Sequence, residues 1–299
     1  MIELMPQFTH SRRAFLSTAT AAAVSAQSRE LILDIHQHTD YSGRTDEALL
    51  AHQARMGITK TVLLPAGSRY GLEAGASGNG RCLELVRRYP DKFTMFANEV
   101  PYDDSFSQVI EKYLKLGAIG IGEQKFFVDV LSPVMDKIAG VAQANGVPVL
   151  LHFQHERYNV NYGQFHRVLA KYPRVNFIGH AQTFWANIDA KQEQEILYPK
   201  WKVTAGGWTD RYLSDYPNMF ADLSAGSGLN SMTRDIDHAR AFVARHQDKL
   251  IYGSDCNDSD GAGPKCSGSQ QIIMMRKLAP NAAALRKIFE LNAKKVMKI

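Results

Sequence analysis

The sequence is poor in cysteine, with Cys82, Cys256 and Cys266 among its 299 residues. A small and odd number of cysteines argues against the disulfide framework that stabilises many small secreted domains. Cys256 and Cys266 could pair across a short loop, but free thiols fit the sequence at least as well. The spacing of these two residues, C-x9-C, is not typical of a zinc site.

The chain also lacks long apolar stretches and clustered charge of one sign. A membrane-spanning helix needs about 20 predominantly apolar residues, and no segment meets this requirement. The formal net charge is +5, but basic residues never form a run of five. We therefore expect no membrane span and no nucleic-acid partner, and instead a small-molecule substrate. A hydrophobic content of 45% excludes global disorder.

The N-terminal segment has the composition of an export signal. In SRRAFLSTATAAAVSAQS (11–28), the pair Arg12 and Arg13 precedes an alanine-rich stretch and an A-x-A-like cleavage site that ends at Ala26. We interpret residues 1–26 as a twin-arginine signal with cleavage after Ala26, and we expect an exported, periplasmic protein. An amphipathic N-terminal helix is the alternative interpretation.

After this segment, short apolar runs alternate with amphipathic patterns. The apolar runs predict strands at 31–35, 60–64, 93–97, 118–122, 147–151, 175–178, 219–223 and 249–252. The amphipathic patterns predict helices at 46–56, 81–89, 106–116, 133–145, 162–172 and 233–246. Eight strand–helix units in about 270 residues predict an α/β fold, with residues 27–299 forming one (β/α)8 TIM barrel domain.

An open, doubly wound parallel sheet is the alternative fold. The chain lacks a G-x-G-x-x-G motif after the first predicted strand, which favours the barrel. It also lacks a domain linker and low-complexity segments. Long loops at 65–80 and 256–269 follow the second and eighth predicted strands. Because loops after strands form the active-site face of a barrel, these two predict a lid over a substrate.

The first predicted strand ends in a pair of histidines, in the stretch LILDIHQHTD. His36 and His38 stand two residues apart, so both side chains point to the same side of a strand. The H-x-H pattern is a weak signal by itself, since ten histidines give roughly 0.3 chance occurrences. At the mouth of a barrel, however, two imidazoles would supply a pair of nitrogen ligands to a divalent metal.

Polar residues that can bind a metal also follow four other predicted strands. These residues are Glu123 and Lys125 after the fourth strand, His152 after the fifth, His180 after the sixth and Asp255 after the eighth. A single residue of this kind is usually a satisfied core or loop residue. Because a barrel brings its strand ends onto one ring, polar residues after five strands together predict a metal site.

These motifs resemble the amidohydrolase superfamily, whose members carry HxH after strand 1, His after strands 5 and 6, and Asp after strand 8. The closest resemblance is to the amidohydrolase-related branch, which contains metal-dependent hydrolases and non-oxidative decarboxylases. TDRYLSDYPNMFADLSAGSG and KLIYGSDCND are similar to its late barrel segments. LNAKKVMKI is similar to its usual ending, in which an Asn opens a final short helix. The resemblance covers nearly the whole mature chain but indicates little about the substrate.

The resemblance implies one or two divalent ions, with zinc expected and manganese or iron as alternatives. The implied ligands are His36, His38, Glu123, His152, His180 and Asp255. His180 would bind a second metal or position the substrate. Family members carry a carboxylated lysine or a glutamate after strand 4, and we favour Glu123 over Lys125. His155, which lies beyond the strand end, is the less favoured alternative to His152.

The resemblance also assigns catalytic roles and a reaction. Asp255 would accept a proton from the metal-activated water and pass it to the leaving group. His180 would stabilise the oxyanion. We therefore expect hydrolysis of a lactone, amide or ester. The alternatives are decarboxylation of a carboxylated, often aromatic substrate, metal or ligand binding without turnover, and phosphodiester hydrolysis, which the absence of a basic stripe disfavours.

Substrate-binding residues and oligomeric state are less well indicated by the sequence. Arg44, Arg69 and Lys125 could bind a substrate carboxylate, although loop arginines are more often simply exposed to solvent. Ser224, just after the seventh predicted strand, is a weaker candidate. A homodimer is expected from the family resemblance, but no interface can be identified in the sequence.

Overall fold

The computed structural model describes Met1 and residues 30–66 and 75–299 of the chain. All of the predicted export signal except Met1, together with the candidate Arg69, lies outside the described residues, so the signal and its cleavage site stay predictions. Leu31–Ile299 forms one compact unit. No described helix has the length and apolar character that would let it cross a membrane.

Eight parallel strands of the described chain form a closed barrel. They are β1 Leu33–Gln37, β2 Lys60–Leu63, β3 Phe93–Met95, β4 Ile121–Gln124, β5 Val149–His152, β6 Phe177–His180, β7 Met219–Asp222 and β8 Leu250–Ile251. The strands pair in the order β1-β2-β3 in one sheet and β4-β5-β6-β7-β8 in a second sheet. A parallel bridge between Ala97 and Ile121 joins the two sheets on one side. On the other side, the Ile35 amide donates to the Tyr252 carbonyl at 3.2 Å, so the predicted (β/α)8 barrel is confirmed.

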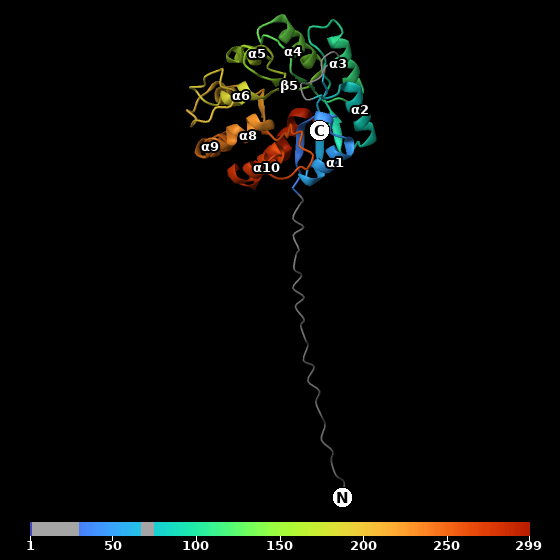
Figure 1. Ribbon diagram of the computed structural model, residues 1–299, viewed down its shortest axis with the longest axis vertical. Helices are drawn as coiled ribbons and strands as arrows, with labels where there is room; N and C mark the ends of the chain where they lie inside the picture. The colour runs from blue at the N-terminus through green and yellow to red at the C-terminus, as the bar shows by residue number, and fades with distance from the viewer. Residues whose placement is uncertain (2–29, 67–74) are drawn as a thin grey trace. The chain divides into compact units, whose positions relative to one another are not determined.

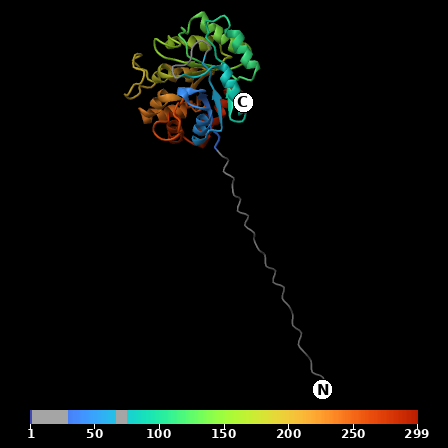
Figure 2. The ribbon, with the colours of Figure 1, turned by 45° about the vertical axis from the view of Figure 1, so that its right-hand side comes forward.

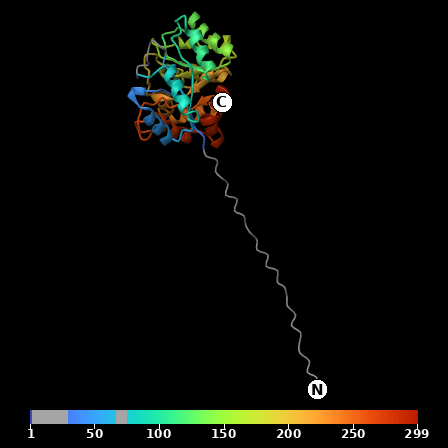
Figure 3. The same ribbon diagram turned by 90° about the vertical axis from the view of Figure 1, so that its right-hand side faces the viewer.

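Helices form an outer ring around these strands, as Figure 1 and the turned views in Figures 2 and 3 show. They are α1 Asp46–Arg55, α2 Asn79–Arg88, α3 Phe106–Lys115, α4 Pro133–Asn145, α5 His166–Lys171, α6 Gln182–Ala186, α7 Trp208–Asp215, α8 Ala225–Thr233, α9 Ile236–His246, α10 Ser267–Leu278, α11 Ala282–Arg286 and α12 Asn292–Met297. Short turns of helix lie at η1 Tyr41–Gly43, η2 Tyr162–Gln164 and η3 Lys287–Leu291.

The predicted helices are present in the structure, most of them close to their predicted bounds. The boundaries of α1 to α4 agree with prediction within two residues, and α12 begins at the expected Asn292. The predicted helix at 162–172 is divided into η2 and α5. Helix α8 was not predicted, because its sequence AGSGLNSMT contains two glycines and several weak helix formers. In the folded chain this helix packs against α6 and α10.

Four strands begin two or three residues later than the apolar runs predict. For example, β5 begins at Val149 instead of residue 147, and β6 begins at Phe177 instead of residue 175. Val147 and Val175 belong to the segments that enter these strands, and their side chains pack into the apolar layer between strands and helices. These two strands also end later than predicted, at residues 152 and 180 instead of 151 and 178, so His152 and His180 are the last residues of their strands.

An apolar core fills the barrel below its mouth. Its members include Leu33, Ile35, Val62, Leu64, Phe96, Leu150, Ile178, Phe220 and Ile251, and α12 adds Ala293, Val296 and Met297. On the strand-end side, this core gives way to polar residues. Gly253 permits close contact there, since a Cβ at this position would overlap with Asp222 Oδ1 and lie 3.0 Å from the His36 Cβ.

Substitution of glycine by alanine should have opposite effects on stability at a crowded position and at an open one. Gly253→Ala should lower the free energy of unfolding by about 1–3 kcal/mol, because the added methyl group has no space. Gly140→Ala in α4, where a Cβ meets nothing within 4 Å, should raise it by about 0.5–1 kcal/mol. Urea unfolding of both variants measures the difference, and equal stabilities would contradict the packing described here.

Candidate metal centre

Three strands place polar side chains directly above the apolar core. His152, His180 and Asp222 end β5, β6 and β7. Each lies two residues after an inner core residue, so it points to the same side of its strand. The mouth of the barrel is therefore lined by polar groups that face one another.

Strand β1 reaches the same centre through an irregularity. Ile35 points into the inner core, and regular alternation would turn the next residue, His36, to the other side. The pairing of β1 with β2 changes register between Asp34 and Gln37. A local irregularity of this kind reorients side chains, and it allows both Ile35 and His36 to face the barrel axis.

Five of the sequence-predicted ligands place their donor atoms within a small volume. The Nε2 atoms of His36 and His38 lie 3.2 Å apart. Glu123 Oε2 is 3.7 Å from His36 Nε2 and 3.6 Å from His38 Nε2. Asp255 Oδ1 lies 3.6 and 3.5 Å from the same two nitrogens. His180 Nε2 lies 3.7 Å from Glu123 Oε1 and 3.5 Å from Asp255 Oδ2.

The hydrogen bonds of the first two histidines point their lone pairs at each other. His36 Nδ1 donates to Asp222 Oδ2 at 2.7 Å, and His38 Nδ1 donates to the Leu64 carbonyl at 2.7 Å. A neutral imidazole carries one N–H group, so each Nε2 presents a lone pair to the other. A cation or a shared proton is needed between these nitrogens. The surrounding carboxylates and imidazoles form a donor set that fits a divalent metal.

His152, the sixth predicted ligand, completes the group on the side of β5. Its Nδ1 lies 2.5 Å from Glu123 Oε1. Its Nε2 is buried and has no hydrogen-bond partner among the described residues. A buried ring nitrogen without a partner is unfavourable unless it accepts from a ligand or binds a cation. His152 therefore also fits a metal centre.

Asp222 and Ser224 lie behind the metal-facing side of the rings. Ser224 Oγ donates to Asp222 Oδ2 at 2.7 Å and lies 3.0 Å from His180 Nδ1. Asp222 Oδ2 is also 3.2 Å from His180 Nδ1. The sequence suggested Ser224 as a weak substrate contact, but its buried hydroxyl orients the histidines. No sequence signal distinguished the role of Asp222 from that of an ordinary strand residue.

The charges of the centre reinforce one another. Burial opposes ionisation of Asp255, but His36 and hydrogen bonds from His180 and His38 outweigh it and hold the Asp255 pKa well below its ordinary value. Burial also opposes charge on His36, but Asp255 and Asp222 raise its pKa well above the ordinary value. The pKa of Asp222 is lowered to about 2, because the contacts with His36 and His180 outweigh its burial.

Tyr41 is a part of the site that sequence reasoning missed. Its hydroxyl donates to Asp255 Oδ1 at 3.0 Å, and its ring meets the His38 ring edge-on at 5.0 Å between centroids. The charge of Asp255, together with burial, raises the Tyr41 pKa. The position of Tyr41, three residues after His38, was the available signal, but a loop tyrosine is too common to be informative by itself.

Arg44 and Lys125, the two described cationic candidates for substrate binding, contact other parts of the chain. The Arg44 guanidinium is buried and donates to the carbonyls of Cys256 and Asp258 and to Gln37 Oε1, so it supports the loop after β8. Lys125 Nζ lies 5.6 Å from the centre of the Tyr158 ring. This ring in turn meets His152 edge-on.

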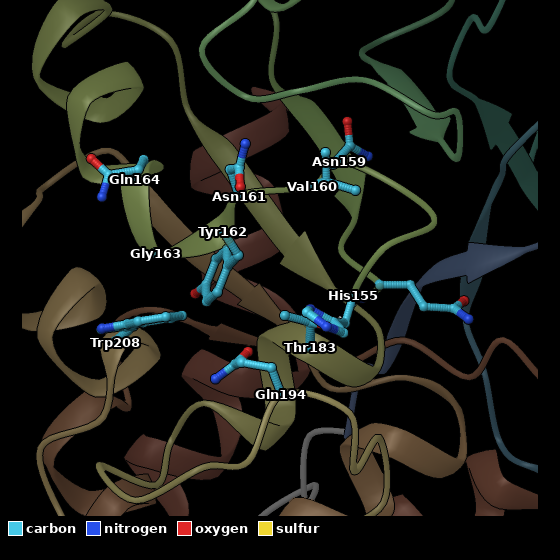
Figure 4. A pocket seen from close by; sticks show the side chains of 11 residues that line it. His155, Asn159, Val160, Asn161, Tyr162, Gly163, Gln164, Thr183, Gln194 and Trp208 are labelled. Carbon is cyan, nitrogen blue, oxygen red and sulfur yellow. Dashed lines mark hydrogen bonds between the residues drawn. The ribbon is translucent and has the colours of Figure 1, made fainter.

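A cavity of about 270 Å³ lies among the loops that follow β5 and β6 (Figure 4). Its lining includes His155, Asn159, Tyr162, Thr183 and Trp208. His155, the less favoured ligand alternative, thus lines this cavity and lies outside the group of metal-facing atoms. None of the described lining residues is Lys, Arg, Asp or Glu.

The fold and the polar ring at the strand ends define a class, the metal-dependent TIM-barrel enzymes of the amidohydrolase type. The family model described as Amidohydrolase matches residues 34–299, so the chain belongs to this family and the resemblance noted in the sequence is confirmed. The family includes hydrolases and decarboxylases. No curated protein matches the chain significantly.

Solved structures share the fold at low sequence identity. An uncharacterised TIM-barrel protein from Bordetella bronchiseptica has 16% identity, a TM-score of 0.63 and coverage of 90% of this chain and 98% of its own. A probable 2-pyrone-4,6-dicarboxylic acid hydrolase from Acinetobacter baumannii has 14% identity and a TM-score of 0.61, and the match covers 90% of this chain and 99% of its own. A 5-carboxyvanillate decarboxylase from Novosphingobium aromaticivorans, complexed with manganese, has 15% identity and a TM-score of 0.53, and the match covers 84% of this chain and 79% of its own.

The contacts of Asp222 predict an effect on metal affinity. In Asp222→Asn, the amide cannot accept from every donor that the carboxylate oxygens now serve, so the His36 and His180 rings lose their fixed orientation. Affinity for Zn²⁺ should fall by about 10–100-fold, as measured by competition with a chromophoric chelator. Asp215→Asn on the exposed surface of α7 is the matched control, and equal affinities in both variants would exclude this role.

The raised pKa of His36 predicts proton release. The raised pKa of His36 favours its protonated form in the metal-free protein, whereas the lowered pKa values of Glu123 and Asp255 favour their ionised forms. A bound cation must displace the His36 proton, so metal affinity should rise with pH and binding at pH 7 should release about one proton. Calorimetry in two buffers of different ionisation enthalpy measures this number, and zero release would contradict the charge assignment.

Proposed function

We propose that the protein is a metal-dependent hydrolase of a small organic substrate with a lactone, ester or amide bond. The observation that carries this proposal is the orientation of Asp255. Its Oδ1 faces His36 and His38, while its Oδ2 faces His180. One carboxylate oxygen can therefore contact a cation while the other takes part in proton transfer.

We assign the cation to His36, His38, Glu123, His152 and Asp255, with His180 as a ligand when two ions bind. Zinc is the proposed ion, and manganese or iron are alternatives. A divalent ion at this position polarises a carbonyl group and lowers the pKa of water. The remaining steps depend on the side chains of the chain itself.

Asp255 acts as the proton acceptor and donor. Asp255 is ionised because its pKa is lowered, and in this form one carboxylate oxygen can accept a proton from the attacking water. The Tyr41 hydroxyl contacts Oδ1 and limits rotation of the group. The proton then passes to the leaving group. The side chain of Asp255 is 12% exposed, so a substrate can approach it.

His180 positions and stabilises the substrate oxygen. Ser224 and Asp222 contact its Nδ1, which directs Nε2 toward the centre. A preorganised N–H group at this position can donate to a developing oxyanion. Burial and the charge of His36 oppose a proton on His180, but Asp222 and Asp255, whose carboxylates accept from the His180 ring, raise its pKa above the ordinary value, which favours the donor form.

The neighbouring cavity favours an uncharged polar substrate. Its lining combines five carboxamide side chains with Thr183, Tyr162 and Trp208. Carboxamides and hydroxyl groups hydrogen-bond neutral polar groups, and an aromatic face can contact a ring.

Decarboxylation is the second candidate, and Lys125 is the observation that favours it. Lys125 lies beside Tyr158, which contacts His152, and its ammonium group could bind a substrate carboxylate. One structurally similar protein is a decarboxylase. The two reactions differ in their products, because decarboxylation releases CO₂ and leaves no new acid.

The experiment is a screen of the zinc-loaded and manganese-loaded protein against lactones, esters, amides and carboxylated aromatics. Hydrolysis is followed by acid release and decarboxylation by CO₂ release. With an active substrate, His180→Gln should lower kcat by about 10²–10³-fold while the protein retains at least one equivalent of metal.

His155→Gln, the same substitution in the neighbouring cavity, is the matched control and should change KM more than kcat. CO₂ release without hydrolysis would replace the first proposal by the second. Absence of turnover in a metal-loaded protein would leave a binding function.

A further inference from the structure

A second group of metal-binding side chains lies outside the centre described above. His52 belongs to α1, Cys256 follows Asp255, and Cys266 precedes α10. All three are buried. The Sγ atoms of the two cysteines lie 3.5 Å apart, and Cys266 Sγ lies 3.4 Å from His52 Nε2. One nitrogen and two sulfur donors therefore meet in the interior, and each pair lies within 4.8 Å.

The hydrogen bonds around His52 direct a lone pair at the sulfur atoms. Gln53 Nε2 donates to Asp34 Oδ2 at 2.8 Å and to Thr61 Oγ1 at 2.7 Å, which turns Gln53 Oε1 toward His52 Nδ1 at 3.0 Å. An amide oxygen can only accept, so the proton of His52 resides on Nδ1. In the neutral imidazole the lone pair is then on Nε2, which faces Cys266 Sγ. A fixed second nitrogen is the usual arrangement of a metal-binding histidine.

The separations agree with a tetrahedral site. With metal–sulfur bonds of about 2.3 Å and metal–nitrogen bonds of about 2.0–2.1 Å, two sulfurs lie about 3.8 Å apart and sulfur and nitrogen about 3.6 Å apart. The observed values of 3.5 and 3.4 Å are slightly shorter. The separation of the two sulfur atoms, 3.5 Å, exceeds the bond length of a disulfide, which is about 2.05 Å.

A fourth donor is available beside these three. Met56 Sδ, at the end of α1, lies 3.6 Å from Cys266 Sγ. Thiolate, imidazole and thioether donors together favour soft ions, of which Zn²⁺ and Cu⁺ accept tetrahedral coordination. The spacing C-x9-C gave no indication of this site, because His52 and Met56 come from the other end of the barrel sequence.

We propose that His52, Cys256 and Cys266 form a buried site for a thiophilic metal ion, with Met56 as the fourth neighbour. On binding, each thiol releases its proton to solvent, and the two thiolates with the neutral imidazole form the bonds to the ion. The site joins α1 to the loop after β8. This loop begins at Cys256, whose carbonyl accepts from Gln37 and Arg44, so the ion would stabilise the segment beside Asp255.

The test uses Co²⁺ as a probe of the reduced full-length protein. Ligands of the barrel-mouth centre are nitrogen and oxygen atoms, so a thiolate-to-cobalt charge-transfer band can arise only from a cysteine site. We expect this band in the wild type, with one equivalent of metal more than in Cys266→Ser. Serine at position 266 can still accept from the Ser269 amide, as the cysteine does, which favours folding. Cys82→Ser is the matched control and should retain the band.

X-ray absorption of the zinc-loaded wild type gives a second readout that needs no variant, with sulfur neighbours expected at about 2.3 Å. Absence of the band and of sulfur neighbours in reduced protein would overturn the proposal. So would a band that persists in Cys266→Ser. A mass about 2 Da lower before reduction, with no thiolate-to-cobalt band after reduction, would show a disulfide instead. The result is independent of the proposed hydrolase activity, because a protein without turnover could still give the band.

Discussion

The buried carboxylate of Asp222 is the group on which the geometry of the metal centre depends. It lies behind His36 and His180 and contacts the Nδ1 atom of each, so both rings direct Nε2 toward the barrel axis. A buried charge requires donors, and here the donors are the histidines and Ser224. The same contacts that stabilise the charge therefore fix the orientation of the rings.

Closure of the barrel brings the remaining side chains to this point. The Asp255 amide donates to the His36 carbonyl at 2.8 Å, so the last strand returns to the first at the level of the centre. Asp255 has a positive φ of 39°, a strained conformation for a residue other than glycine. This strain is offset by the hydrogen bond and by the contacts that its carboxylate makes with histidines and Tyr41.

Much of the candidate site was predictable because strand ends are encoded locally. An apolar run followed by His152, His180 or Asp255 identifies the residue that reaches the mouth of a barrel. The choice of Glu123 over Lys125 also agrees with the positions of the two side chains, although metal binding by Glu123 stays a prediction. By contrast, β1 was predicted as a regular strand, and its register shift beside His36 depends on pairing with β2.

The sequence by itself determined the alternation of strands and helices and the residue types at the strand ends, since both depend on local periodicity. Tertiary structure decided which atoms meet. Asp222 supports two distant histidines, Arg44 supports a loop, and His52 faces two cysteines from the far end of the chain. These contacts join residues that are up to 214 positions apart. Their geometry follows from ring closure and close packing, which no local pattern records.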